Sequence, residues 1–448
     1  MPSNRGPVFR MGSSFDLTQT LRALRSRNYR LFFAGQSVSL IGTWMTRIAT
    51  SWLVYRLTDS AFLLGITGFA GQIPAFFLAP LAGVWIDRWN RHRTLVVTQI
   101  LAMIQSLALA ALALSGLINI WWIIGLVFFQ GLINAFDMPA RQAFVVEMIE
   151  QRSDLGNAIA LNSSMVNGAR LIGPAIAGVI IAAAGEGYCF LIDGLSYIAV
   201  VASLLAMNIR PAEARVSNKR VLEELAEGWK YVTASPPIRS ILLLLALVSL
   251  VGMPYSVLVP IMAGGILHGD ANTLGFLMGM SGVGALVSAI SLAMRRSVVG
   301  LGRMIPISAA IFGAGLAFFG LSRLLWISLV MMMFVGFGMM QQMAASNTIL
   351  QTIVEDDKRG RVMSFYTLAI LGVAPIGSLV AGSVAAKIGT PATLMIGGVL
   401  CAVGGLWFWR KLPVLRNHIR PIYVELGILP EMAKGLQSAS ALQAPPEG

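Results

Sequence analysis

The chain has 448 residues, of which 56% are hydrophobic and only 12% are charged, and its formal net charge is +13. A soluble domain has about 25% charged residues, and an ordinary globular fold could not cover so much apolar surface. The composition excludes such a fold and favours helices in lipid, where backbone polar groups must be paired within the protein.

The chain opens with a polar, arginine-rich arm, residues 1–30, which no short apolar core with a small-residue cleavage site follows. The first span is therefore predicted to be an uncleaved anchor. A helix needs about 20 apolar residues to cross a bilayer. Twelve stretches approach or exceed that length: Leu31–Tyr55, Phe62–Trp85, Thr94–Ser115, Ile120–Phe136, Leu155–Ala184, Tyr188–Ile209, Ile238–Ile261, Leu274–Met294, Met304–Leu321, Ile327–Ile349, Val362–Ala386 and Thr393–Trp409.

The longest internal loop lies midway, where Val221, Leu222, Leu225 and Trp229 have helical spacing. This pattern predicts a surface amphipathic helix. The predicted helix divides the chain into two halves. An arm (1–30) precedes the N-terminal six-helix bundle (31–209), and a linker (210–237) leads to the C-terminal six-helix bundle (238–411) and a tail (412–448). A shift of 204 residues places seven residues of the first half on identical residues of the second, which indicates a duplication. Ile149, Gly156, Gly173, Ala177, Gly178, Ala182 and Gly185 fall on Ile353, Gly360, Gly377, Ala381, Gly382, Ala386 and Gly389.

Basic residues are segregated by the predicted spans. With these boundaries, 28 of the 33 Lys and Arg residues fall on the side of the termini, and only Arg56, Arg323 and Lys387 fall on the other. Since basic loops stay in the cytoplasm, both termini are predicted to be cytoplasmic and the protein to be a multi-pass protein of the bacterial inner membrane. Basic residues confined to short loops also favour contact with lipid head groups over binding of nucleic acid.

The loop between spans two and three reads Gly83-Val-Trp-Ile-Asp87-Arg88-Trp-Asn-Arg91-His-Arg93. It resembles the loop signature of the major facilitator superfamily. The resemblance covers essentially the whole chain and implies an all-α membrane protein, with twelve transmembrane helices in two pseudo-symmetric six-helix halves. In that family the loop latches the halves together on the cytoplasmic side, which makes the five numbered residues gating candidates. The alternative is a plain basic loop.

Two further segments resemble one branch of the superfamily, which includes enterobactin exporters and macrolide efflux proteins. They are Asp137-Met-Pro139-Ala-Arg141-Gln-Ala-Phe144, at the end of span four, and Leu191-Ile-Asp193-Gly-Leu-Ser196-Tyr197, in span six. Pro139 is expected to start a short helix, with Asp137 near its N-terminus. For Asp137 and Arg141, a role in capping and a loop salt bridge is weighed equally with a role in gating.

Span five contains Gly168-Ala-Arg170-Leu-Ile-Gly173-Pro174-Ala-Ile-Ala-Gly178. It is similar to the Gly-Pro-rich motif that exporters of the superfamily carry in their fifth helix. Small residues let helices approach closely, and span eight offers a partner face of Gly275, Gly279 and Gly282. The resemblance favours export over import, whereas the alternative is tight packing without any directional meaning.

Three charged residues fall inside predicted spans, namely Arg47, Arg170 and Asp193. Charges at such depth are costly and usually functional. Asp193, with Arg170, is predicted to couple transport to protons. The equally weighted alternative is a structural pair between Asp193 and an arginine.

Span one carries a polar stripe of Ser39, Thr43, Thr46, Arg47 and Thr50 on one helical face. The resemblance implies a central cavity lined by spans one, four, seven and ten, so further polar residues of those spans join the stripe as cavity candidates. The set is Thr43, Thr46, Arg47, Thr50, Gln130, Asn134, Tyr255 and Gln341. For most of them, hydrogen bonding between helices is the stronger alternative.

The sequence contains no Walker loop and no metal-ligand spacing of histidines, so neither an enzyme nor a cofactor is predicted. The leading hypothesis is a monomeric, proton-coupled antiporter that exports a small amphipathic compound, a drug or a siderophore-like product, by alternating access. Two alternatives remain: uptake or uniport of a polar nutrient, and a membrane receptor or scaffold that transports nothing.

Overall fold

The computed structural model describes residues 21–209, 221–295, 297–355, 358–425 and 428; within them, the side chains of residues 79–80, 83–84, 87–88, 152 and 221–225 are not described. Every regular element in this part of the chain is helical. The first half comprises η1 (Arg22–Arg25), α2 (Arg27–Thr58), α3 (Ala61–Arg88), α4 (Arg91–Leu114), α5 (Ile120–Met148), η2 (Arg152–Asp154), α6 (Leu155–Ala184) and α7 (Glu186–Leu205).

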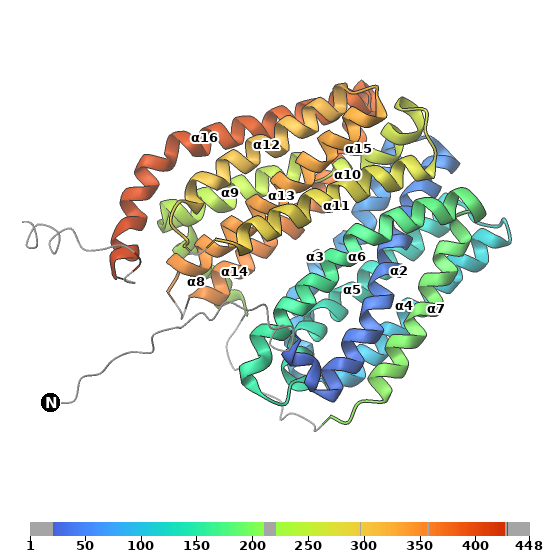
Figure 1. Cartoon of the computed structure of the whole chain (residues 1–448), viewed down its shortest axis with the longest axis horizontal. Helices are drawn as coiled ribbons and strands as arrows, with labels where there is room; N and C mark the ends of the chain where they lie inside the picture. The colour runs from blue at the N-terminus through green and yellow to red at the C-terminus, as the bar shows by residue number, and fades with distance from the viewer. Residues whose placement is uncertain (1–20, 210–220, 296, 356–357, 426–427, 429–448) are drawn as a thin grey trace, which may run out of the picture.

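The amphipathic helix α8 (Val221–Ala234) precedes the second half. That half comprises α9 (Pro236–Val251), α10 (Tyr255–Ile261), η3 (Met262–Ile266), α11 (Ala271–Ala293), α12 (Leu301–Leu321), α13 (Leu325–Ile353), α14 (Arg359–Thr367), η4 (Leu368–Gly372), α15 (Ala374–Ile388) and α16 (Thr390–Glu425). Figure 1 shows the two groups of helices side by side, with α6 and α11 next to each other where they meet.

Within the described residues, eleven helical segments are long and apolar enough to cross a membrane, including the composite segments Pro236–Ile266 and Arg359–Ile388. The 32-residue helix α2 is long enough to be the twelfth. It is less apolar than the others because it carries the polar stripe and Arg47. Twelve spanning helices in two halves confirm the predicted fold class.

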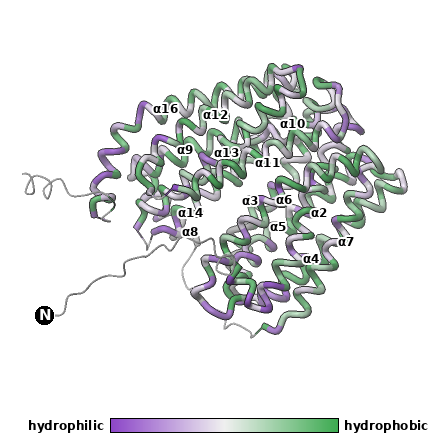
Figure 2. Tube along the Cα trace, viewed as in Figure 1, coloured by the Kyte–Doolittle hydropathy of each residue, from purple (hydrophilic) through white to green (hydrophobic). Residues whose placement is uncertain are grey.

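The exposed surface of the helices suits lipid. Figure 2 shows apolar residues along the lengths of the helices and hydrophilic residues gathered at their ends. Trp121 and Trp326 are 74% and 79% exposed at the starts of α5 and α13. Tryptophan favours this interfacial depth, because its ring is apolar and its N–H still reaches water.

The halves are joined by small residues at one end of the bundle. We call the end where α2 begins the near end and the opposite end, where α3 begins, the far end. A methyl group added at Gly178 of α6 would lie 2.8 Å from the Ala271 carbonyl oxygen of α11, and one at Gly382 of α15 would lie 2.7 Å from the Ala61 carbonyl oxygen of α3. These two crossings, Gly178 on Gly275 and Gly382 on Gly65, form the far-end seam.

The seam repeats between the halves, as the 204-residue shift predicts. Gly173, one and a half turns before Gly178, packs against α2, and its counterpart Gly377 packs against α9. Gly185 and Gly389 end α6 and α15 with φ of 92° and 86°, a backbone conformation that glycine adopts readily. Each half therefore uses its fifth helix to hold its own first helix and to touch the second helix of the other half.

Contacts between the halves fade toward the near end. The glycine contacts between the halves extend about halfway, where Gly282 packs against Leu171 and Gly372 against Phe76. Beyond these residues the helices of the two halves diverge (Figure 1).

One expectation about span four is wrong. Pro139 does not start a new helix, and Asp137 does not cap one, because α5 continues through Pro139 to Met148. Proline is tolerated inside a membrane helix where neighbouring groups satisfy the backbone that it frees. At the C-terminus, α16 also extends past Trp409, to Glu425.

Candidate functional site

The described part of the loop between α3 and α4 is held within the first half. Arg91 forms an ion pair with Glu147 of α5 at 2.8 Å, and the backbone N–H of Arg93 donates to Asn90, which caps α4. Gly83, Asp87 and Arg88 lie in the last turns of α3, and their side chains fall outside the described part of the structure. The loop lies at the near end, away from the far-end seam, and the latch stays a prediction.

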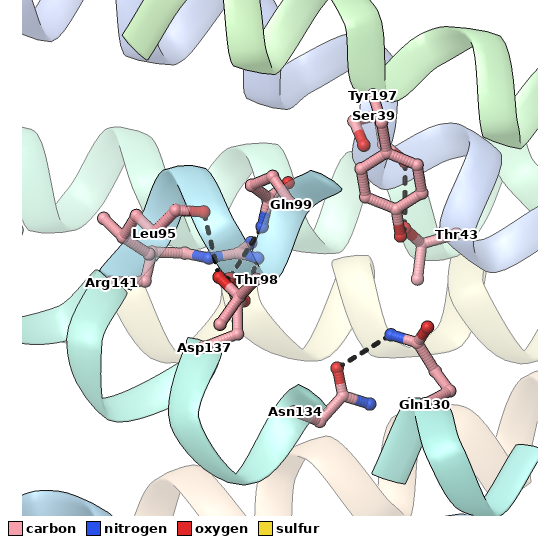
Figure 3. Close-up of polar contacts among 10 residues, drawn as sticks. All are labelled: Ser39, Thr43, Leu95, Thr98, Gln99, Gln130, Asn134, Asp137, Arg141 and Tyr197. Carbon is pink, nitrogen blue, oxygen red and sulfur yellow. Dashed lines mark hydrogen bonds and ion pairs between the residues drawn. The ribbon is translucent and has the colours of Figure 1, made fainter. Parts of the chain in front are cut away.

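Asp137 is buried in a network between α4 and α5 (Figure 3). Its Oδ1 accepts hydrogen bonds from Thr98 at 3.0 Å and Gln99 at 2.6 Å, and its Oδ2 pairs with Arg141 one turn along α5. This carboxylate has a cation on its own helix and two donors on α4, and the two donors fix α4 against α5. Sequence reasoning missed Thr98 and Gln99, whose signal was a polar pair inside an apolar span.

Asp193 of α7 is equally buried, at 2% exposure, but it has no cationic partner among the described residues. Its Oδ2 accepts from Thr46 of α2 at 2.8 Å and from Ser106 of α4 at 3.0 Å, while its Oδ1 has no hydrogen-bond partner. The expected alternative of a structural pair with an arginine is thus not observed. An isolated carboxyl group in an apolar setting is costly to keep ionised.

The two interior arginines meet on one aromatic ring. The guanidinium carbons of Arg47 on α2 and Arg170 on α6 lie 4.6 Å and 5.3 Å from the centre of the Trp44 ring. Gly173 makes room for Trp44, because a methyl group there would lie 2.5 Å from its Cβ. We call these three side chains the arginine–tryptophan cluster. Sequence reasoning named both arginines but missed Trp44, three residues before Arg47.

Most other cavity candidates bond to neighbouring side chains. Figure 3 shows Thr43 beside Tyr197, with their hydroxyl oxygens 3.4 Å apart, and Gln130 donating to Asn134 at 3.1 Å. Two more join helices within the second half: Tyr255 contacts Ser281 at 3.0 Å, and Gln341 accepts from Ser288 at 2.6 Å. Thr50 is buried in α2. The contacts of Thr43, Tyr255 and Gln341 join different helices, whereas the bond between Gln130 and Asn134 lies within α5.

The Gly-Pro-rich motif of α6 contains residues packed against other helices and one glycine in open space. Gly173, Pro174 and Gly178 are buried, and the Pro174 carbonyl oxygen and Gly178 both press against Gly275 of α11. Gly168 has open space where a side chain would project. As the glycine spacing predicts, α11 presents Gly275, Gly279 and Gly282 to this helix.

Known proteins match this sequence over most of its length. Residues 18–421 match a family described as transmembrane secretion effector. The staphyloferrin A transporter of Staphylococcus aureus is 25% identical over 83% of this chain and 92% of its own. The multidrug efflux pump Tap of Mycolicibacterium fortuitum is 26% identical, over 79% and 88% of the two chains. Macrolide efflux protein A of Streptococcus pyogenes is 24% identical, over 83% and 94%.

Solved structures share the fold at lower identity. A bacterial homologue of the human lysosomal transporter Spinster, in an inward-facing and unoccupied conformation, aligns with a TM-score of 0.65 at 14% identity, over 88% of this chain and 98% of its own. The nucleoside transporter NupG aligns with a TM-score of 0.65 at 14% identity, over 87% and 99%.

Proposed function

Because the chain belongs to the transmembrane secretion effector family of the major facilitator superfamily, we propose that it exports a small amphipathic compound, a drug or a siderophore-like product. Two relatives that align over most of their length are named as efflux proteins, and a third as a transporter of a staphyloferrin. The membrane is the bacterial inner membrane, and the near end of the bundle faces the cytoplasm.

The far-end seam is the observation that carries this proposal. Two pseudo-symmetric crossings of small residues join the halves at one end, while the helices diverge toward the other. A pair of halves that meets at a single end can rock about its middle and close the opposite end instead. In this orientation, the protein accepts a compound from the cytoplasm and releases it outside after the seam opens.

Asp193 couples this movement to protons. Its carboxyl group joins α2, α4 and α7 through Thr46 and Ser106, so gain or loss of a proton changes contacts of three helices together. One Oδ atom without a partner leaves room for the proton on the buried group. The loop residues Gly83, Asp87, Arg88, Arg91 and Arg93 then latch the near end when the far end is open.

The test is accumulation of a fluorescent drug by cells that express the protein. Collapsing the proton gradient with a protonophore should raise the internal drug in these cells; a fall in internal drug contradicts export. In liposomes, Asp193→Asn should abolish proton-driven transport and keep exchange of compound for compound. Glu186→Gln is the matched control, because this acid of the same helix already pairs with Arg56 at 2.9 Å. Unchanged proton dependence in Asp193→Asn removes Asp193 from the mechanism.

A further inference from the structure

Two positive charges lie together at mid-depth in this membrane protein. Arg47 is near the middle of α2, and Arg170 is midway along α6. Both guanidinium groups lie over the Trp44 ring. Their central carbons are 4.6 Å and 5.3 Å from the ring centre, so the two positive charges are close together. Stacking on an aromatic ring leaves the N–H edges of each guanidinium group available to bind acidic oxygens.

No described acid neutralises this cluster. Neither arginine forms an ion pair with any described residue, and the Nε atom of Arg170 is buried without a hydrogen-bond partner. The four buried acids of the described residues are engaged elsewhere: Asp193 accepts from Thr46 and Ser106, and Asp137, Asp154 and Glu186 pair with Arg141, Arg22 and Arg56. Uncompensated cations at this depth are costly, so a negative charge brought by another molecule would be strongly stabilised here.

The cluster faces the space between the halves. Arg47 is exposed although it lies halfway along a spanning helix, and a cation on the lipid face would be costly. Its helix α2 also contacts α10 and α11 of the second half. Arg170 directly precedes Leu171, against whose backbone Gly282 of α11 packs. A molecule bound at the cluster therefore touches both halves, as a transported compound must.

We propose that the arginine–tryptophan cluster binds the acidic groups of the transported compound, which is therefore a compact anion with two or more carboxylates and some apolar surface. This inference rests on the proposed function and narrows its substrate class. Each guanidinium group takes one carboxylate in a two-pronged arrangement, and Trp44 contacts the apolar frame. A neutral or cationic drug would leave both charges unpaired and would bind poorly.

The test uses the purified full-length protein in discs of neutral phosphatidylcholine, with citrate as the anionic probe and spermidine as the cationic one. Citrate should bind the wild type and raise its unfolding temperature, and spermidine should do neither. Arg47→Gln and Arg170→Gln should each weaken citrate binding roughly tenfold or more. Arg323→Gln, which removes an exposed charge at the far end, should bind citrate like the wild type.

A second readout separates a binding role from a structural one. If the arginines serve the ligand, Arg47→Gln and Arg170→Gln should unfold at a higher temperature than the empty wild type, because each removes an unpaired charge. Lower unfolding temperatures with unchanged citrate binding would make them structural and overturn the inference. Stabilisation by phosphatidylglycerol but not by citrate would assign the site to lipid, which also overturns it.

The outcomes also separate this inference from the export proposal. Transport of a cationic drug without any binding of citrate would overturn the anionic substrate and leave export standing. Binding of citrate that needs both arginines, without flux of any compound in liposomes, would support the site and overturn transport.

Discussion

Two aspartates of similar burial differ in their surroundings, and this difference separates their roles. Asp137 has Arg141, Thr98 and Gln99 as partners, whereas Asp193 has two hydroxyl groups and no described cation. Arg141 lies on the same helix as Asp137 and compensates its charge, while Thr98 and Gln99 of α4 tie this charged pair to the neighbouring helix. A buried carboxyl group without a cationic partner can change its charge as the structure changes around it.

Removing the charge of Asp137 should therefore cost stability. We expect Asp137→Asn to lower the free energy of unfolding by about 3 kcal/mol, because it leaves the Arg141 cation without its partner. The lower end of the usual range applies, since the Arg141 side chain keeps 24% of its surface exposed. Thermal unfolding in detergent measures the loss. The double variant with Arg141→Gln should recover part of it; a double variant as unstable as the single one would contradict the ion-pair account.

At the scale of single helices, α6 shows how one motif serves two neighbours. Gly173 admits Trp44 of α2, within the first half, and Gly178 admits the backbone of α11, in the second half. The five-residue spacing directs these two glycines to different sides of the helix. The exporter-like motif thus ties the arginine–tryptophan cluster to the far-end seam along one rigid element.

Two alanine substitutions in this motif should behave in opposite ways. Gly178→Ala places a methyl group 2.8 Å from the Ala271 carbonyl oxygen, so it should cost about 1–3 kcal/mol and slow transport. Gly168→Ala meets nothing within 4 Å and should be neutral or stabilise the helix by roughly 0.5–1 kcal/mol. Unfolding temperature and liposome flux measure both. Equal effects of the two substitutions would show that the seam does not depend on close approach.

The start of α11 should respond to pH through its capping residue. Partial burial alone would raise the pKa of Asp270, but hydrogen bonds from Asn272 and from the Thr273 backbone outweigh it and lower the pKa below its ordinary value of 3.8. The cap therefore stabilises fully above that value, and its contribution disappears as pH falls through the lower folded-state pKa.

Asp270→Ala should cost about 1 kcal/mol at neutral pH and progressively less as the pH falls below roughly 4. Unfolding midpoints of variant and wild type, compared across this range, measure the change. Asp270→Asn is the control, because asparagine caps a helix about as well and does not titrate. A cost of Asp270→Ala that stays constant with pH would show that the charge of Asp270 contributes nothing.

At the scale of the whole molecule, the orientation can be checked with two exposed positions. Arg323 follows α12 at the far end, and Arg416 lies in the extension of α16 at the near end. In intact cells, a membrane-impermeant maleimide should label Arg323→Cys and should label Arg416→Cys only after the cells are opened. The native Cys189 and Cys401 are buried and provide a low background. The reverse labelling would invert the direction of transport.

The sequence predicts the architecture better than the contacts. Span lengths and segregated arginines lead to the twelve-helix fold, because the bilayer imposes both on any chain, and the 204-residue repeat divides that fold into two halves. The meeting of Arg47 and Arg170 on Trp44, and the pairing of Arg91 with Glu147, depend on how each helix is rotated about its axis. A mostly apolar span does not encode that rotation, except where glycines mark a close approach, as at Gly178 and Gly275.

The far-end seam has a consequence for how readily the protein changes state. Glycine crossings interlock little side-chain surface, so parting them strips away little dispersion energy and exposes few bulky groups. Interdigitated leucines at this position would cost much more energy to separate. The glycine crossings can separate and close again without any side chain having to repack. The two arrangements can then differ by only a few kcal/mol, within reach of what one bound ligand or one proton supplies.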